Sequence, residues 1–343
     1  MRAQITVLVC CLISVHAEAQ STPFSIDALA TLPANKRADA LYQLRESPDG
    51  LPTLQELELA VRLRVDARRE RETPPLSLGC MTADEFDLDT LLGLARESKN
   101  RPAFDTAVRE YRGKTAELDT KLAAARRTNL WWKQFPALRQ WEHEWRAAKE
   151  PRTRELLYRT LSGQAIRASL AREKGPVVSA GTKGQQRRVP RPSGSALASN
   201  AYREYIFNLM CTDDEQNLRW FKQQIAEIGW FDMRRYGWAA DRAALLIVQH
   251  ADVDPAFQSS VVDVLEPRLA AGDTDPENFA YLVDRVAVRA GQPQRFGTQM
   301  ECVNGQWVVP EIVDHPTLDE RRKRMNLVAY GVQLARTRGL CRN

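Results

Sequence analysis

The sequence lacks the short motifs that identify a reaction mechanism. It contains no Gly-x-Ser-x-Gly nucleophile elbow, no glycine-rich phosphate loop, no His-Glu-x-x-His metal motif and no paired-carboxylate signature. No two cysteines stand in Cys-x-x-Cys spacing, so neither a zinc site nor thioredoxin-like chemistry is expected. We therefore predict no cofactor and no metal, and these absences favour a binding protein over an enzyme.

A large excess of charge of one sign is also missing. The 49 lysines and arginines nearly balance the 44 aspartates and glutamates, which leaves a net charge of +5. Both signs are mixed along the predicted helices, as is typical of solvated helix faces, so no nucleic-acid partner is expected. No segment beyond the first residues approaches the length of a membrane span, so we expect no stable membrane insertion.

The first residues have the features of a cleaved export signal. Arg2 is followed by a short apolar run over Ile5–Val15, and Ala17–Ala19 supplies the small-x-small pattern that signal peptidase recognises. Residues 1–19 are therefore predicted to be a signal peptide, with cleavage before Gln20. The protein is expected to be periplasmic or secreted.

Four cysteines remain after the predicted cleavage site. An even number in an exported chain indicates two disulfides, for which three pairings exist. We favour Cys302–Cys341, which ties the C-terminal tail to a predicted hairpin. The second pair is then Cys80–Cys211, which joins the two predicted domains.

The hydrophobic periodicity predicts a mainly α fold with two helical domains, at residues 20–173 and 200–343. A flexible basic linker is predicted at 174–199, where Gly, Ser, Pro, Gln and Arg replace the periodic pattern. Capping boxes at Thr53–Glu56 and Thr82–Glu85 begin two helices of the first domain. Long helices are expected near 54–72, 83–98, 102–127 and 152–173.

The second domain is predicted to combine helices with one small β-hairpin. Helices are expected over 201–210 and 212–228, and the apolar run Ala243–Val248 predicts a buried central helix. Asn304-Gly305 is the preferred two-residue turn of a hairpin, which we place near 295–312. A capping box at Thr317–Glu320 is expected to begin the last helix, which Gly339 should end.

Tryptophans and leucines recur at helical spacing in the first domain. Leu138, Trp141 and Trp145 share one face, which favours core packing between helices over a sugar-stacking platform. His143 lies between two glutamates, but adjacent helical residues point about 100° apart, so it is expected at the surface or the boundary and not at a metal.

Several polar residues of the second domain are candidates for a site. His250 ends the predicted buried helix and can exchange a proton near neutral pH, although a purely structural histidine is the slightly favoured alternative. Gln249 beside it offers a donor and an acceptor. Asp284 and Arg285 lie off the apolar stripe of their helix, where either a structural ion pair or a site is possible.

Four more candidates follow along the chain. Thr298 and Gln299 alternate across a predicted strand, and Gly297 before them permits close approach of another backbone or a ligand. Arg321 and Arg322 lie in the first turns of the last helix, where positive charge opposes the helix dipole. Acidic groups or an anionic ligand are expected opposite them.

From about Asp214 to Leu327 the chain resembles an uncharacterised bacterial family, a domain of unknown function. The resemblance is carried by five segments in matching order and spacing: Gly229-Trp230, Val248–Asp252, Tyr281–Arg285, Phe296–Gln299 and Asp319–Arg322. Phe231 stands where the family usually has proline, and Phe296 where it usually has tyrosine. The resemblance implies a shared domain and brings no established activity.

Two classes of function follow. The first is an exported binding or interaction protein that recognises a small or polymeric anionic ligand in the cell envelope through Gln249, Arg285, Thr298, Gln299, Arg321 and Arg322. The second is a hydrolase or transferase in which His250 accepts a proton and Asp284 orients it. The missing catalytic motifs favour the first class.

Overall fold

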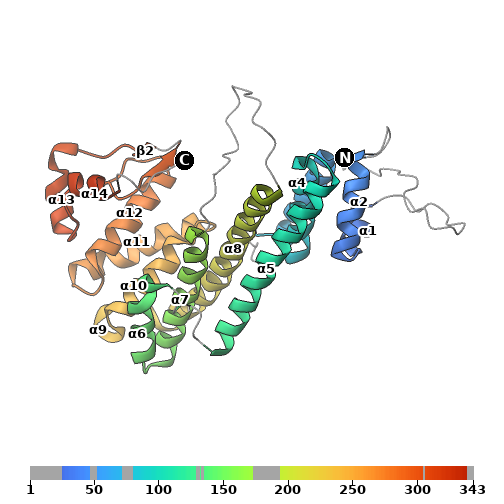
Figure 1. The fold of residues 1–343 in the computed structure, drawn as a ribbon. Helices are drawn as coiled ribbons and strands as arrows, with labels where there is room; N and C mark the ends of the chain where they lie inside the picture. The colour runs from blue at the N-terminus through green and yellow to red at the C-terminus, as the bar shows by residue number, and fades with distance from the viewer. Residues whose placement is uncertain are drawn as a thin grey trace, which may run out of the picture. The chain divides into compact units, whose positions relative to one another are not determined.

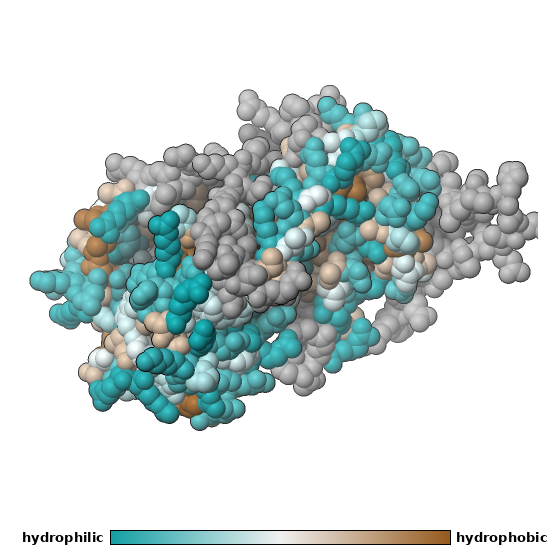
Figure 2. Space-filling view, turned by 60° about the horizontal axis from the view of Figure 1, so that its bottom comes forward, coloured by the Kyte–Doolittle hydropathy of each residue, from teal (hydrophilic) through white to brown (hydrophobic). Residues whose placement is uncertain are grey.

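The computed structural model describes residues 25–46, 52–71, 80–128, 132, 135–172, 194–303 and 306–337. The predicted signal peptide and most of the predicted linker lie outside these ranges. Within them, no helix is long and apolar enough to cross a membrane. On the face seen in Figure 2, hydrophilic residues predominate and hydrophobic ones form small separate patches.

Helices make up most of the regular structure in the described ranges, which confirms the mainly α prediction (Figure 1). The first half contains α1 (Ile26–Thr31), α2 (Ala34–Glu46), α3 (Leu54–Arg71), α4 (Ala83–Glu97), α5 (Arg101–Thr128), η2 (Pro136–Leu138), α6 (Arg139–Ala147) and α7 (Pro151–Arg172). The second half contains α8 (Gly194–Ile228), α9 (Met233–Tyr236), α10 (Trp238–Gln249), α11 (Pro255–Ala270), α12 (Pro276–Arg289), η3 (His315–Thr317), α13 (Leu318–Arg324) and α14 (Tyr330–Thr337).

The β structure of the described residues is one short hairpin and one isolated bridge. Strands β1 (Glu301–Val303) and β2 (Gln306–Val308) are antiparallel, with Cys302 opposite Trp307. A single parallel bridge joins Gln294 to Ile312. The hairpin confirms the predicted element, but its strands are shorter than the 295–312 span because residues 294–299 form a loop that is held by side chains.

The chain divides into two compact units that interleave along the sequence. Residues 1–128 and 169–211 form the first unit, and residues 129–168 and 212–343 form the second. Helix α8 contributes its residues up to Cys211 to the first unit and those from Thr212 to the second. Helix α7 up to Ala168 belongs to the second unit, whereas the sequence placed it in an N-terminal domain.

The first unit has an apolar core in which α2 and α3 pack against α4. Leu41, Leu91 and Phe104 are fully buried there. The capping box at Thr82 is formed, because its hydroxyl accepts from the Glu85 amide while the Glu85 carboxylate accepts from the Thr82 amide. These local signals set the helix starts as the sequence predicted.

A disulfide joins the start of α4 to the middle of α8. Cys80 and Cys211 are bonded, as predicted, although both belong to the first unit. Asn208 pairs with both the amide and the carbonyl of Met81 next to this bond. Cys302 is also disulfide-bonded; its expected partner Cys341 lies outside the described residues.

The second unit is built around α10. Ala243, Ala244, Leu245 and Val248 are buried, which confirms the central helix predicted from its apolar sequence. Trp141 and Trp145 of α6 are buried as well, and Leu138 precedes them in the same core. Core packing therefore accounts for this aromatic face, while His143 between the two tryptophans is exposed.

Three predicted boundaries are wrong. Residues 194–199 belong to α8 and not to a linker, and α8 continues through Thr212 instead of restarting there. No glycine or proline interrupts the helix, so the pattern at Thr212 acts as helix interior. Helix α13 does begin after Thr317 as predicted, but the Thr317 side chain makes no cap hydrogen bond. The last helix is also split, because Asn326 has a positive φ of 56° between α13 and α14.

Candidate functional site

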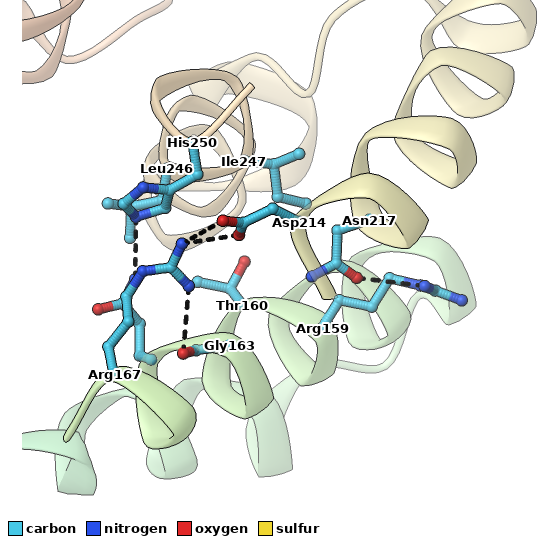
Figure 3. Close-up of a pocket in the computed structure, with 10 residues that line it drawn as sticks. Arg159, Thr160, Gly163, Arg167, Asp214, Asn217, Leu246, Ile247 and His250 are labelled. Carbon is cyan, nitrogen blue, oxygen red and sulfur yellow. Dashed lines mark hydrogen bonds and ion pairs between the residues drawn. The ribbon is translucent and has the colours of Figure 1, made fainter. Parts of the chain in front are cut away.

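A small polar pocket lies in the second unit between α7, α8 and α10 (Figure 3). Its volume is about 10 Å³, close to the space that one water molecule needs. The lining consists mainly of polar side chains at helical spacing: Arg159, Thr160, Gly163, Gln164 and Arg167 of α7, Asp214 and Asn217 of α8, and His250 with Leu246 and Ile247 of α10 or its end.

Arg167 and Asp214 form a largely buried ion pair in this pocket. Both carboxylate oxygens of Asp214 accept from Arg167 Nη2 at 2.7 Å, and Arg167 Nη1 donates to the Gly163 carbonyl at 3.2 Å. The two side chains are largely buried, at 17% and 21% exposed. Burial raises the pKa of Asp214, and the adjacent Arg167 opposes this change.

Glycine at position 163 lets α7 and α8 approach closely. A Cβ atom there would lie 2.7 Å from Asp213 Oδ2 and 3.3 Å from Arg167 Nη1. Asn217, one turn beyond Asp213, donates to the same Asp213 oxygen at 2.8 Å and accepts from Arg159 Nη1 at 3.3 Å. The absent side chain therefore leaves the space in which these polar groups meet.

His250 caps the end of α10 and faces the pocket. Its Nε2 lies 3.5 Å from Gln164 Nε2, so the amide donates if this ring nitrogen is unprotonated. Burial lowers the pKa of His250 to about 3, with help from the positive charges of Arg167 and Arg285 and against the charge of Asp252. The imidazole is therefore neutral at physiological pH.

A second ion cluster adjoins His250. Arg285 pairs with both oxygens of Asp252, and Arg289 Nη1 lies 3.0 Å from Asp252 Oδ1. Burial opposes ionisation of Asp252, but the hydrogen bond and charge of Arg285 outweigh it and lower the pKa of this carboxyl. Three arginines (167, 285 and 289) and two aspartates (214 and 252) leave one formal positive charge around the neutral imidazole.

Asp284 is turned in another direction, towards the loop after α12. It is fully buried, and its carboxylate accepts from the backbone amides of Arg295, Phe296 and Thr298 at 2.7–3.2 Å. The Thr298 hydroxyl donates to it at 2.9 Å. Among the described residues, no hydrogen bond joins Asp284 to His250. The arrangement lets Asp284 fix the shape of the loop.

The other predicted ligand-binding residues of this region support the same loop. Gln299 Nε2 donates to the Tyr281 carbonyl at 3.3 Å and to the Thr298 hydroxyl at 3.1 Å. The fully buried Arg322 donates to the Phe296 and Val328 carbonyls.

Arg321 contacts the start of this loop. It donates to the Arg295 carbonyl at 2.8 Å and lies 3.6 Å from Asp314, one of the acidic partners expected for these arginines. Most hydrogen bonds from Arg321 and Arg322 therefore go to backbone carbonyls, and not to the acidic groups expected from the sequence.

Gly297 is needed where this loop is tightest. Its φ is +63°, a region that favours glycine, and an added Cβ would lie 2.8 Å from Ile312 Cδ1. Close approach at this position was predicted, but the approaching group is the protein's own side chain.

The predicted site residues thus fall into two groups. His250 and Arg285 belong to the polar pocket and its adjoining cluster, together with Gln249, whose carbonyl accepts from Gln258 at 3.3 Å. The second group holds the loop after α12 and is called the loop clamp here; it consists of Asp284, Thr298, Gln299, Arg321 and Arg322.

Sequence reasoning missed the α7 contribution to the pocket. The available signal was the spacing of Arg159, Gly163 and Arg167, which recur every four residues and therefore share one helix face. Sequence reasoning also missed Asp241, which is fully buried and accepts from Trp230 Nε1 at 2.7 Å and from the Thr274 hydroxyl at 2.8 Å. A lone aspartate inside an apolar helix gave the only hint of that role.

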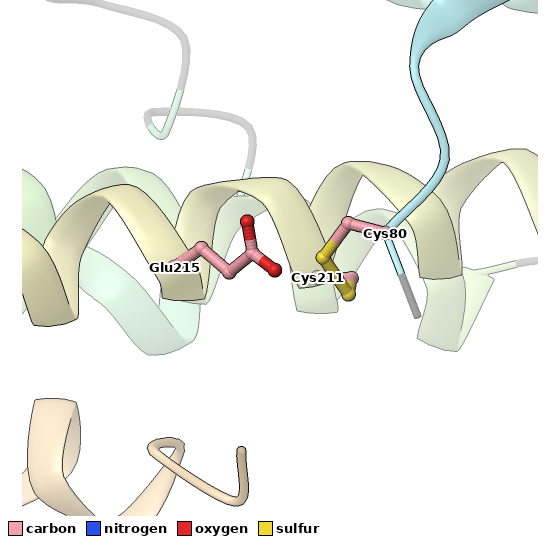
Figure 4. A group of neighbouring side chains, drawn as sticks. All are labelled: Cys80, Cys211 and Glu215. Atoms are coloured by element: carbon pink, nitrogen blue, oxygen red, sulfur yellow. A yellow bond between two sulfur atoms is a disulfide. The ribbon is translucent and has the colours of Figure 1, made fainter. Parts of the chain in front are cut away.

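One group of potential metal ligands occurs in the described parts of the chain. Cys80, Cys211 and Glu215 have ligand atoms within 4.8 Å of one another (Figure 4). The two sulfur atoms are bonded to each other, so neither is a thiolate. This group is therefore a disulfide with a neighbouring carboxylate and supplies no thiolate ligand.

Residues 195–334 match the model of a family of unknown function, DUF6624. The match covers the five segments on which the resemblance rested, together with the first turns of α8. No curated protein and no solved structure matches the chain. The α7 residues of the polar pocket lie outside the matched range, so the family segment supplies only the α8 and α10 sides of this pocket.

Proposed function

We propose that the chain is an exported binding protein whose second unit recognises a small or polymeric anionic ligand of the cell envelope. The observation that carries this proposal is the polar pocket itself. Arg159 and Arg167 line it beside a neutral histidine and the amides of Gln164 and Asn217. Guanidinium and amide donors are the groups that proteins use for carboxylates and phosphates.

The ligand presents only a small charged group to this pocket. A volume of about 10 Å³ matches roughly one water molecule, so a carboxylate or phosphate requires Arg159 and Arg167 to move outward. The excess positive charge of the adjoining Arg285 and Arg289 attracts an anion from the surface. The remainder of the ligand then lies outside the pocket, which suits a chain end or side group of a polymer.

Binding is favoured over hydrolysis or transfer for two reasons. A histidine whose pKa is lowered to about 3 is a weak base at neutral pH. The carboxylate expected to orient it, Asp284, is instead occupied by loop donors. A catalytic role for His250 would therefore require a ligand that restores its basicity.

Export is supported by the cysteine chemistry. The Cys80–Cys211 disulfide suits an oxidising compartment outside the cytoplasm. N-terminal sequencing of the native protein is expected to begin at Gln20. An intact Met1 would contradict export through the predicted signal peptide.

Calorimetric titration tests the anion site. Inorganic phosphate, acetate and sodium polyphosphate serve as probes with the full chain from Gln20. At least one is expected to bind, and the double variant Arg167→Gln/Asp214→Asn is expected to weaken it about tenfold or more, the effect of about 1.4 kcal/mol. This variant removes both charges together, so no buried charge is left unpaired.

The matched control is Arg109→Gln, which removes an exposed arginine of the first unit. It is expected to bind as the wild type does. If no probe binds, or if the double variant and the wild type bind alike, the pocket is not an anion site.

A further inference from the structure

An open groove of about 700 Å³ runs along the first unit between α4 and the first half of α8. Its lining on α8 recurs at helical spacing through Leu197, Ala201, Glu204, Asn208 and Cys211. Between residues 197 and 211 an α-helix rises about 21 Å. The groove therefore follows α8 for about four turns.

Helix α4 forms the facing wall with the same regularity. Phe86, Thr90, Gly93 and Glu97 line it at intervals of three and four residues. Two helices that present one face each along a groove of this length leave room for a third helix to pack between them. The dimensions therefore suit a helix better than a compact small molecule.

The groove exposes apolar surface that a partner would cover. Phe207 is 46% exposed and Met81 is partly exposed, whereas Leu94 and Leu197 line the groove as buried side chains. A large apolar side chain that is exposed in a groove with a polar rim is a surface that a protein partner can cover. Gly93 lies in the same wall, and a Cβ added to it would meet nothing within 4 Å.

The charges at the rim of the groove indicate which sign of charge a partner must carry. Arg96 is paired with Glu58 and Glu97. Asp89 and Glu204 also line the groove, and neither makes an ion pair within the described residues. Burial raises the pKa of Asp89, and the charges of Arg62 and Arg96 oppose this change only in part.

We propose that this groove is a docking site for a basic amphipathic helix of a partner protein. The apolar face of that helix covers Phe207 and its neighbours, and lysines or arginines at its border pair with Asp89 and Glu204. The helix needs about four turns to fill the groove. This interaction is independent of the anion pocket, which lies in the other unit.

Gly93→Trp provides a direct test, because its side chain points into open space in the groove and tryptophan tolerates a helix better than glycine does. Gly113→Trp is the matched control, since this glycine of α5 is exposed, also has nothing within 4 Å of an added Cβ, and lies outside the groove. Asp89→Asn removes one rim charge, and Gly93→Leu replaces Gly93→Trp if the latter does not fold.

The probe is a fluorescent synthetic peptide of leucine and lysine, designed as an amphipathic helix of about four turns. A second peptide carries glutamate in place of lysine. Fluorescence anisotropy with the full chain is expected to show saturable binding of the lysine peptide to the wild type and to Gly113→Trp. Binding should be about tenfold weaker for Gly93→Trp, several-fold weaker for Asp89→Asn, and at least tenfold weaker for the glutamate peptide.

Three outcomes would overturn the proposal. The first is a lysine peptide that does not saturate or that binds Gly93→Trp and wild type equally. The second is equal binding of both peptides, which removes the charge argument. The third is a wild-type dimer in sedimentation velocity that Gly93→Trp dissociates, because the groove would then be filled by a second copy of the chain.

Discussion

Replacing Asp284 by alanine should strongly destabilise the second unit. The carboxylate is fully buried and accepts hydrogen bonds from three backbone amides and one hydroxyl of the loop over residues 295–298. Each buried amide that loses its acceptor costs about 1–3 kcal/mol. Part of this cost is relieved if the loop opens to water, so we expect a total loss of about 3–5 kcal/mol, as for other broken buried charged contacts.

Urea denaturation followed by tryptophan fluorescence measures this loss selectively. All 8 tryptophans of the sequence lie in the second unit, so the signal reports on that unit and not on the other. Asp232→Ala is the control, because this aspartate caps α9 with one exposed hydrogen bond to the Arg235 amide. Its loss should be about 0.5–2 kcal/mol.

A loss of less than about 1 kcal/mol for Asp284→Ala, within the range of the single exposed cap, would show that this carboxylate does not hold the loop. A further check uses Arg322→Met, which removes a donor to the Phe296 carbonyl of the same loop and a donor to the Val328 carbonyl between α13 and α14. The two substitutions act on one loop, so the double variant should lose less stability than the sum of the single losses. Strict additivity would show that the loop is not a cooperative clamp.

Three further predictions concern other parts of the molecule. Gly163→Leu should abolish anion binding because its side chain displaces Asp213, and calorimetry with an unchanged affinity would contradict the pocket geometry. The folded-state pKa of His250 is lowered to about 3, below the ordinary value of 6.5, so the unfolded chain binds the extra proton and stability falls as the pH decreases from about 6.5 towards 3. His250→Gln should flatten this dependence by up to about 1.4 kcal/mol per pH unit in urea titrations, whereas an unchanged slope would show that the imidazole does not cause it. The Cys80→Ser/Cys211→Ser variant should lose about 2–5 kcal/mol in circular-dichroism unfolding, since the disulfide spans a sequence separation of 131 residues, and an unaltered midpoint would remove its stabilising role.

The sequence by itself determined several of the helices and their starts. Thr53 and Thr82 form capping boxes that depend only on residues three positions apart. The apolar run of α10 favours burial on every side of the helix, whichever elements surround it. The Asn304-Gly305 pair likewise predicted a hairpin, which β1 and β2 confirm. These features are local, so short segments carry all the information they need.

Only the tertiary structure decided which polar residues meet. Helical spacing places Asp284 and Arg285 on different faces, but it does not say that one faces the loop after α12 and the other faces Asp252. His250 lies beside Gln164, which is 86 positions away in the sequence. Gln164 belongs to α7, a helix that the sequence assigned to another domain. Such partners are selected by the packing of whole helices, because the burial of many apolar side chains outweighs any single polar contact and fixes where each polar group lies.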